Sequence, residues 1–306
     1  MDKEKFDVIV IGAGPAGLTA GLYAGRAGLN TLILEKISLG GRILLTEKIE
    51  NFPGVGKEIL SFDLVKNMED QIKQFSNVKI LFEQVKSIDF NLKRVYLEDE
   101  YCQAQGIIIA TGAKEKKIGV KGEEEFLGKG VSYCAVCDGP FYKNKDVAVI
   151  GGGDSALEEA IYLSRFCQKV KLIHRRNAFR ASPALQSRLA KIPNIEIILN
   201  KAILEIKGKD KVERVLIKDN ISGKESLVDC CAVFIYVGIK PNTDFLKDSI
   251  QLDEQGFIIT DETMATSQEG VFACGDCRKK TLYQIITACA EGAVAINSFT
   301  NYLLRK

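Results

Sequence analysis

Residues 7–17 read DVIVIGAGPAG and residues 146–156 read DVAVIGGGDSA, so one pattern occurs twice, 139 positions apart. In each copy an apolar run suited to a buried parallel strand leads into a glycine-rich turn, a helical stretch and a second apolar run. The pattern therefore predicts the same strand–helix–strand unit twice. The helical stretches are expected at 18–27 and 157–166, and the second strands at 31–34 and 170–173.

The glycine spacing is that of a dinucleotide-binding turn. The first glycine turns the chain from strand to helix, the second lets backbone N–H groups approach a pyrophosphate, and the third position lets helix and strand pack closely. The alternative, that the glycines have a purely structural role, would have to account for the pattern in both copies at once. We therefore predict two dinucleotide sites. The first includes Gly12, Gly14, Pro15, Ala16 and Gly17, and the second Gly151, Gly153, Asp154 and Ser155.

The two copies differ 23 positions after the first glycine. The first copy has Glu35 there, a carboxylate that can accept hydrogen bonds from an adenosine ribose and would repel a 2′-phosphate. The second has His174, which is followed by a cluster of arginines, whose guanidinium groups bind phosphate in a bidentate manner. The first copy thus suits FAD or NAD and the second NADPH, unless residues 174–180 are only a solvated basic loop. The cluster comprises Arg175, Arg176 and Arg180.

Two dinucleotides in one chain indicate electron transfer between them, with a flavin accepting hydride from NADPH. His174, the single histidine, is then interpreted as a phosphate neighbour and not as a catalytic base.

A cysteine pair lies just before the second copy, where residues 133–139 read YCAVCDG. The two-residue gap lets the sulfurs of Cys134 and Cys137 meet, and such pairs often contain a thiol of lowered pKa that attacks an outside disulfide. Asp138 is placed to exchange a proton with a leaving thiolate. The alternatives are half of a zinc site or two unpaired buried thiols.

A second CxxC, Cys274 with Cys277, could complete a four-cysteine zinc site. The 136 residues between the pairs are far more than compact zinc modules contain, so we expect no metal. Cys230 and Cys231 lie in an apolar run and are interpreted as core. Three further cysteines are expected to be small buried hydrophobes. They are Cys102, Cys167 and Cys289.

The composition excludes several classes of protein. The 306 residues are 46% hydrophobic, which suits two ordinary domains. With 42 basic and 40 acidic side chains, a net charge of +2 gives no field that would hold nucleic acid or an anionic membrane. One histidine leaves little room for Ser-His-Asp hydrolysis. Nine irregularly spaced cysteines are typical of a reduced, cytoplasmic protein.

An uncharged run at 8–25 is long enough to suggest a membrane span. It contains five glycines and Pro15, and no cleavage pattern of a signal peptide follows it. A buried strand, a turn and a helix explain the run better.

Taken together, the motifs resemble, over the whole chain, the low-molecular-weight thioredoxin reductases, bacterial-type flavoenzymes that depend on FAD and NADPH. The marks stand in family order. They are the turn at 12–17, Gly40-Gly41, ENFPG at 50–54, ATGA at 110–113, CAVCDG at 134–139, GGGDS at 151–155, HRR at 174–176 with Arg180, GIKPNT at 238–243 and Gly275-Asp276.

The resemblance implies an α/β fold of two Rossmann-like three-layer domains, the second inserted into the first. Residues 1–115 and 245–306 would form the FAD domain, and 116–244 the NADPH domain with the redox cysteines. Asp276 would bind the ribityl chain, with Gln284 and Ile285 against the isoalloxazine. The FAD site would further include Glu35, Gly40, Gly41, Arg42, Thr46, Asn51, Ala110, Thr111, Gly112 and Gly275, and the NADPH site Gly238.

The implied reaction passes hydride from NADPH to flavin and then to a Cys134–Cys137 disulfide, which reduces thioredoxin. Cys137 would be the flavin-side sulfur and Cys134 the one that attacks thioredoxin. The inserted domain would rotate on linkers at 113–117 and 241–244, because one CxxC cannot lie at the flavin and on a partner at once. Family members are homodimers.

The chain departs from the family pattern at a few positions. Arg42 stands where Gln is usual and could raise the flavin potential, steady the anionic reduced flavin or point to solvent. Tyr283 replaces a common Arg, and Cys274 and Cys277 replace Ala and Val. The retained arginine cluster argues against ferredoxin-dependent relatives.

Other hypotheses are a flavin-dependent reductase of another disulfide protein, one driven by NADH or ferredoxin, and a non-catalytic nucleotide or zinc sensor.

Overall fold

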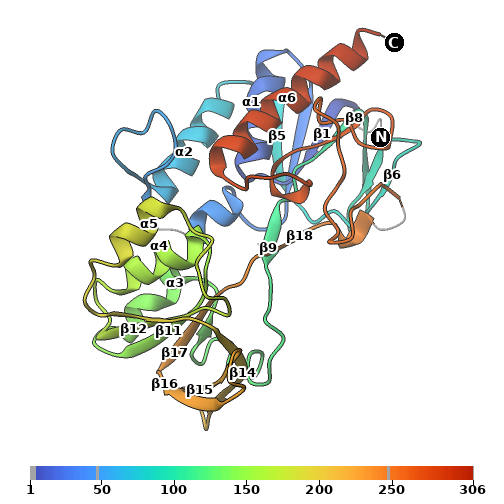
Figure 1. Ribbon diagram of the computed structural model, residues 1–306. Coiled ribbons are helices and arrows are strands. Elements are labelled where there is room, and N and C mark those ends of the chain that lie inside the picture. The colour runs from blue at the N-terminus through green and yellow to red at the C-terminus, as the bar shows by residue number, and fades with distance from the viewer. Residues whose placement is uncertain (1–4, 46–47, 247–248, 306) are drawn as a thin grey trace. The chain divides into compact units, whose positions relative to one another are not determined.

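The computed structural model describes residues 5–45, 48–246 and 249–305. The chain divides into two compact units. The first consists of Met1–Lys114 and Lys240–Lys306, and the second, Glu115–Ile239, is inserted between these segments (Figure 1).

The first unit is built on a mostly parallel sheet. Its order is β5-β2-β1-β8-β7-β6, and β19 also pairs with β8. The carboxyl half of β8 pairs with β19 in parallel, and its amino half pairs with β7 in antiparallel orientation. The strands are β1 (Lys5–Ile11), β2 (Thr31–Glu35), β5 (Val78–Phe82), β6 (Ser87–Asp89), β7 (Arg94–Tyr96), β8 (Tyr101–Ile109) and β19 (Val271–Ala273).

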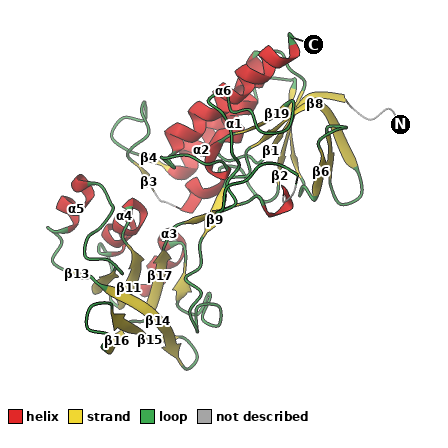
Figure 2. Ribbon diagram, turned by 45° about the vertical axis from the view of Figure 1, so that its right-hand side comes forward, coloured by secondary structure: helices red, strands yellow, loops and turns green. Residues whose placement is uncertain are grey.

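Apolar layers cover both faces of this sheet. Val8 and Val10 of β1 face a core shared with three helices, whereas Ile9 and Ile11 face a second core that includes Ile258. This alternation is why the strand is almost wholly apolar. The helices, drawn in Figure 2, are α1 (Pro15–Arg26), α2 (Ser61–Ile72) and α6 (Ile285–Leu303). Short elements are 3-10 helices Gly41–Leu45, Asp244–Leu246 and Gly275–Cys277, and the hairpin β3 (Lys48–Ile49) with β4 (Ile59–Leu60).

Helices α1 and α6 pack very closely at a glycine. A Cβ added at Gly292 of α6 would lie 2.3 Å from the carbonyl oxygen of Ala16 in α1. The missing side chain therefore lets α6 approach the start of α1, directly behind the first glycine-rich turn.

The second unit repeats the plan with a parallel sheet of order β10-β17-β11-β12-β13 and adds the antiparallel sheet β14-β15-β16. Its strands are β10 (Val131–Ser132), β11 (Asp146–Gly151), β12 (Lys169–Ile173), β13 (Ile195–Ile198), β14 (Lys201–Gly208), β15 (Val212–Asp219), β16 (Glu225–Asp229) and β17 (Ala232–Tyr236). Its helices are α3 (Ala135–Asp138), α4 (Asp154–Leu163) and α5 (Pro183–Leu189), with a 3-10 helix at Gly139–Tyr142.

The predicted repeat is confirmed: β1, α1 and β2 correspond to β11, α4 and β12, and both strand pairs are parallel. Both helices begin three residues earlier than predicted, at Pro15 and Asp154, because Gly14 and Gly153 are their N-caps. The uncharged run at 8–25 is divided between β1 and α1 as expected. Among the described helices, none is both long enough and apolar enough to cross a membrane.

Two short strands, β9 (Ala113–Glu115) and β18 (Ile239–Pro241), carry the chain across the boundaries of the two units and pair with each other. Within the second unit Lys116 N–H donates to Gly238 O, and within the first Asn242 N–H donates to Gly112 O.

Candidate dinucleotide and redox sites

The first glycine-rich turn has the close packing that its spacing predicts. Gly12 has φ +103°, and a Cβ there would lie 2.4 Å from Ala110 O. A Cβ on Gly17 would lie 1.8 Å from Gly12 O. Gly14 differs, because its Cβ would meet only Gly40 O, at 4.0 Å. The second glycine thus borders open space in front of the α1 N-terminus, which fits a pyrophosphate.

Glu35, the last residue of β2, is fixed to this turn by its carboxylate. Oε2 accepts a hydrogen bond from Ala13 N–H at 2.8 Å, and Oε1 accepts from Lys36 and Ile37 N–H at 2.8 and 3.0 Å. The carboxylate therefore lies at the carboxyl edge of the sheet, beside the turn. This is where an adenosine ribose is read in doubly wound folds.

The other predicted flavin-site segments meet at the same edge. Ala110 N–H donates to Ile11 O, Cys274 N–H donates to Ile109 O, and Gly40 N–H donates to Ala13 O. Asn51 Nδ2 donates to Gln284 Oε1 at 3.0 Å, and Gln284 is the N-cap of α6 through a capping box with Thr287. Ile285 follows it as the first residue of the helix. The predicted site residue Thr46 lies outside the described residues.

Asp276 is held between two cations. Arg42 Nη1 lies 3.3 Å from Oδ2, and Lys280 Nζ lies 3.2 Å from Oδ1. Oδ1 is buried and accepts no hydrogen bond of good geometry within the described chain. A buried carboxylate oxygen in this condition fits a ligand hydroxyl as donor. Arg42 therefore contacts Asp276, and its side chain is 35% exposed.

Sequence reasoning missed the residues behind Asp276, namely Arg278, Lys280 and Glu291. Glu291 Oε2 accepts from Gly275 N–H at 2.8 Å, and Oε1 accepts from Arg278 Nη1 at 2.9 Å. The signal that could have identified them is Glu291 itself, the single charged residue in the 19-residue stretch that forms α6.

Tyr283 packs on Phe257, with the ring centroids 5.5 Å apart.

The second glycine-rich turn has the same design. A Cβ on Gly151 would lie 2.4 Å from Tyr236 O, whereas one on Gly153 would meet nothing within 4 Å. Gly152 is covered by the ring of His174, whose atoms would lie 2.3 Å from an added Cβ. Open space again borders the second glycine, at the N-terminus of α4.

His174 is buried, with 6% of its surface exposed. Burial lowers its pKa, and the neighbouring Arg176, Arg180 and Arg175 lower it further. The ring is thus a neutral packing group beneath Gly152, and the cations beside it are exposed. The role of His174 as a phosphate neighbour stays a prediction, and the ring lies against Gly152 of the glycine-rich turn.

The arginine loop is tied to the turn through its backbone. Arg180 N–H donates to Gly152 O at 2.7 Å, and Ser182 N–H donates to Asp154 Oδ1 at 2.7 Å. The first helical residue of α4 therefore anchors the loop that bears the guanidinium groups. The backbone at Arg180 thus lies beside the turn that precedes α4, a helix N-terminus at which an anion is favoured.

The redox segment lies in the same unit. Cys134 is disulfide-bonded, and Cys137 falls within α3, although its side chain lies outside the described part of the structure. Cys134 N–H donates to Ser132 Oγ at 3.0 Å, and Ala135 N–H donates to Tyr236 Oη at 2.9 Å. Burial raises the pKa of Tyr236, so this hydroxyl stays neutral. Ser132 and Tyr236 are supporting residues that no sequence pattern identifies.

The remaining seven cysteines form no disulfide. Cys277 Sγ donates to Cys274 O at 3.2 Å and Ile109 O at 3.4 Å, and both thiols are fully buried. Cys102 lies in the partly buried amino half of β8 and is only half-buried, contrary to the prediction, and Cys231 is also half-buried. Within the described ranges no three His, Cys, Asp or Glu side chains are grouped to hold a metal ion.

Residues 6–292 match the family model for pyridine nucleotide-disulphide oxidoreductases. The chain belongs to this family, whose members use a flavin and a pyridine nucleotide.

Similar proteins narrow the class. A thioredoxin reductase from Treponema pallidum is 43% identical and one from Bacillus subtilis is 42% identical; the matches cover 98% of both chains in the first case and 99% and 96% in the second. The structure of Lactococcus lactis thioredoxin reductase matches with TM-score 0.95 at 40% identity, covering 98% of this chain and 100% of that one. These similarities confirm the resemblance and the fold class predicted from the sequence.

Proposed function

We propose that this chain is an NADPH-dependent thioredoxin reductase. The net reaction converts NADPH, a proton and a thioredoxin disulfide into NADP⁺ and the thioredoxin dithiol. One observation carries the proposal: Tyr236 contacts a nucleotide turn and the redox segment together. Its carbonyl oxygen packs against Gly151, and its hydroxyl accepts a hydrogen bond from Ala135, next to the disulfide-bonded Cys134.

The first unit would hold FAD. The N–H groups at the α1 N-terminus would bind the pyrophosphate in the space in front of Gly14, and Glu35 would accept hydrogen bonds from the ribose hydroxyls. Asp276 would accept a hydrogen bond from a ribityl hydroxyl. Bound FAD would relay the hydride of NADPH to the Cys134–Cys137 disulfide. We assign this role to residues 1–115 and 245–306, and the NADPH role to residues 116–244.

The second unit would select NADPH over NADH. The exposed guanidinium groups of Arg175, Arg176 and Arg180 lie on a loop fixed to the turn at Gly152 and Asp154. Bidentate contacts to a 2′-phosphate would favour NADPH, because NADH has only a neutral hydroxyl at that position.

The dithiol would reduce thioredoxin by two exchange steps. The Cys134 thiolate attacks one sulfur of the thioredoxin disulfide, and the other sulfur leaves as a thiolate that Asp138 can protonate. The Cys137 thiolate then displaces the second thioredoxin sulfur and re-forms the Cys134–Cys137 disulfide. We further propose that the enzyme is a cytoplasmic homodimer.

The test is an anaerobic titration of wild-type protein and a Cys134→Ser variant, followed in the flavin absorption spectrum. NADPH should bleach the flavin of both, and oxidised thioredoxin should restore it only in the wild type. If NADH or reduced ferredoxin bleached the flavin more efficiently than NADPH, that compound would be the electron donor in place of NADPH. Retention of flavin colour with every donor would refute the reductase and favour a nucleotide sensor.

A further inference from the structure

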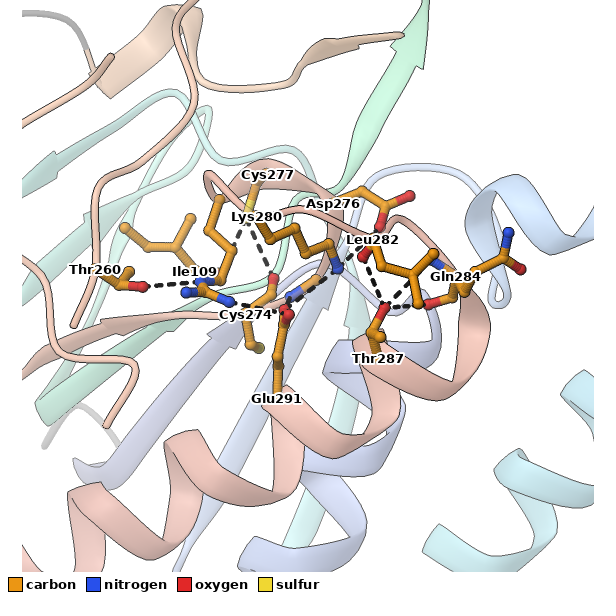
Figure 3. A network of polar contacts seen from close by, with 12 residues as sticks. Ile109, Thr260, Cys274, Asp276, Cys277, Lys280, Leu282, Gln284, Thr287 and Glu291 are labelled. Carbon is orange, nitrogen blue, oxygen red and sulfur yellow. Dashed lines mark hydrogen bonds and ion pairs between the residues drawn. The ribbon is translucent and has the colours of Figure 1, made fainter. Parts of the chain in front are cut away.

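A buried ion-pair network lies directly behind the Asp276 turn (Figure 3). It joins Arg278 and Lys280, just after the 3-10 helix Gly275–Cys277, to Glu291 in α6. The side chains are 13%, 6% and 11% exposed, respectively. Charges buried to this degree are stable only when they are paired and hydrogen-bonded.

Glu291 accepts three donors from one short segment. They are Gly275 N–H at 2.8 Å, Arg278 Nη1 at 2.9 Å and Lys280 Nζ at 3.3 Å. Arg278 is also fixed by Nε, which donates to Thr260 Oγ1 at 2.8 Å. The long helix α6 therefore holds the backbone at Gly275 and both cations in one arrangement.

Lys280 extends this network to Asp276. Its ammonium lies 3.3 Å from Glu291 Oε2 and 3.2 Å from Asp276 Oδ1, so it bridges the two carboxylates. Arg42 approaches the other oxygen of Asp276 but is 35% exposed, against 6% for Lys280. Because screening by water weakens the exposed pair, Lys280 is the stronger constraint on the carboxylate.

We propose that Lys280 is a positioning residue for the flavin dinucleotide. It connects Asp276 to α6 and holds the buried Oδ1 where a ligand hydroxyl can donate to it. This inference rests on the proposed FAD site but not on thioredoxin reduction. Without the ammonium, the carboxylate can turn toward Arg42, and the ribityl half of FAD loses an oriented acceptor.

The test compares Lys280→Met with Lys279→Met. The adjacent Lys279 is exposed, so its substitution is a matched control. FAD is stripped from each protein, and its dissociation constant is measured by the change of flavin fluorescence on rebinding. We expect Lys280→Met to weaken FAD binding roughly 10- to 100-fold, because a hydrogen bond to a charged group is lost or misdirected. Lys279→Met should bind FAD as the wild type does.

Competition by ADP separates positioning from general damage. ADP carries the pyrophosphate and adenosine half of FAD but no ribityl chain, so its affinity should be unchanged in Lys280→Met. Lys280→Arg, which retains the charge, should recover part of the FAD affinity. Glu291 keeps Arg278 and Gly275 N–H in the Lys280→Met protein, so the flavin-free form should unfold at a similar temperature.

Unchanged FAD affinity in Lys280→Met would overturn the inference. Equal weakening of FAD and ADP would also overturn it and assign Lys280 a structural role. Lys280→Gln is the substitute if the Met variant does not fold, with the same expectations. A wild type that binds FAD without reducing thioredoxin would refute the proposed function alone, whereas one that binds no FAD would refute both.

Discussion

At the scale of single residues, Cys274 and Cys277 show that spacing alone does not make a redox pair. Burial raises the pKa of Cys277 to about 11 and that of Cys274 well above its usual value. Because the raised pKa keeps both sulfurs in the thiol form, little of either would be the reactive thiolate. We expect both to resist iodoacetamide in the folded protein, as mass spectrometry of tryptic peptides would show.

The half-buried Cys231 and Cys102 are the controls and should be alkylated under the same conditions. In guanidinium, all the free cysteines should react. Rapid labelling of Cys274 or Cys277 in the native protein would contradict their assignment as inert thiols, as would loss of turnover in a Cys274→Ala/Cys277→Ala variant.

Arg176 allows a second test at this scale. Its guanidinium is exposed beside the buried, neutral His174, so it is available to a 2′-phosphate. Arg176→Ala should raise the KM for NADPH roughly tenfold or more and leave the KM for NADH unchanged. Steady-state kinetics with both nucleotides would measure this. Arg214→Ala, in strand β15, should change neither, and an equal effect on both nucleotides would refute 2′-phosphate recognition.

At the scale of elements, alanine at the second glycine of each glycine-rich turn should affect a different ligand in each unit. A Cβ at Gly14 or Gly153 meets almost nothing, and both residues have extended backbone angles that alanine adopts. Gly14→Ala and Gly153→Ala should therefore fold with a loss of about 1 kcal/mol or less. Gly14→Ala should weaken FAD binding and spare the KM for NADPH, and Gly153→Ala should do the reverse.

Fluorescence titration would measure the affinity for FAD, and steady-state kinetics the KM for NADPH, in both variants. The contrasting variant is Gly17→Ala, whose Cβ would lie 1.8 Å from Gly12 O and should prevent correct folding of the unit. If Gly153→Ala bound NADPH normally, the space in front of α4 would not be the pyrophosphate site.

The same elements show what can be predicted from a sequence. Strands, turns and helices in the repeat depend on neighbours within a few residues, so the order β1-α1-β2 and its copy follow from glycine spacing and apolar runs. The helix starts were missed by three residues, because the N-cap role of Gly14 and Gly153 was not recognised. Glycine has no side chain that could cap a helix, so no capping residue marks where either helix begins.

At the scale of the molecule, contacts between residues far apart in the sequence could not be predicted. Arg42 and Asp276 are 234 positions apart, and Glu291 meets its partners only because α6 packs behind the turn. Such contacts are set by tertiary packing, which no local pattern encodes. The burial of His174 had the same cause: its place after a strand was predictable, but its direction beneath Gly152 was not.

The described residues form four apolar clusters, two confined to each unit. Because each unit has its own core, we expect two transitions in calorimetry of the flavin-free protein. FAD at about 100 times its dissociation constant adds about 2.7 kcal/mol to the unit that binds it and should raise one transition by roughly 5–10 °C. NADP⁺ should raise only the other, and Gly153→Ala should abolish that shift. A single transition moved equally by both ligands would show that the units unfold together.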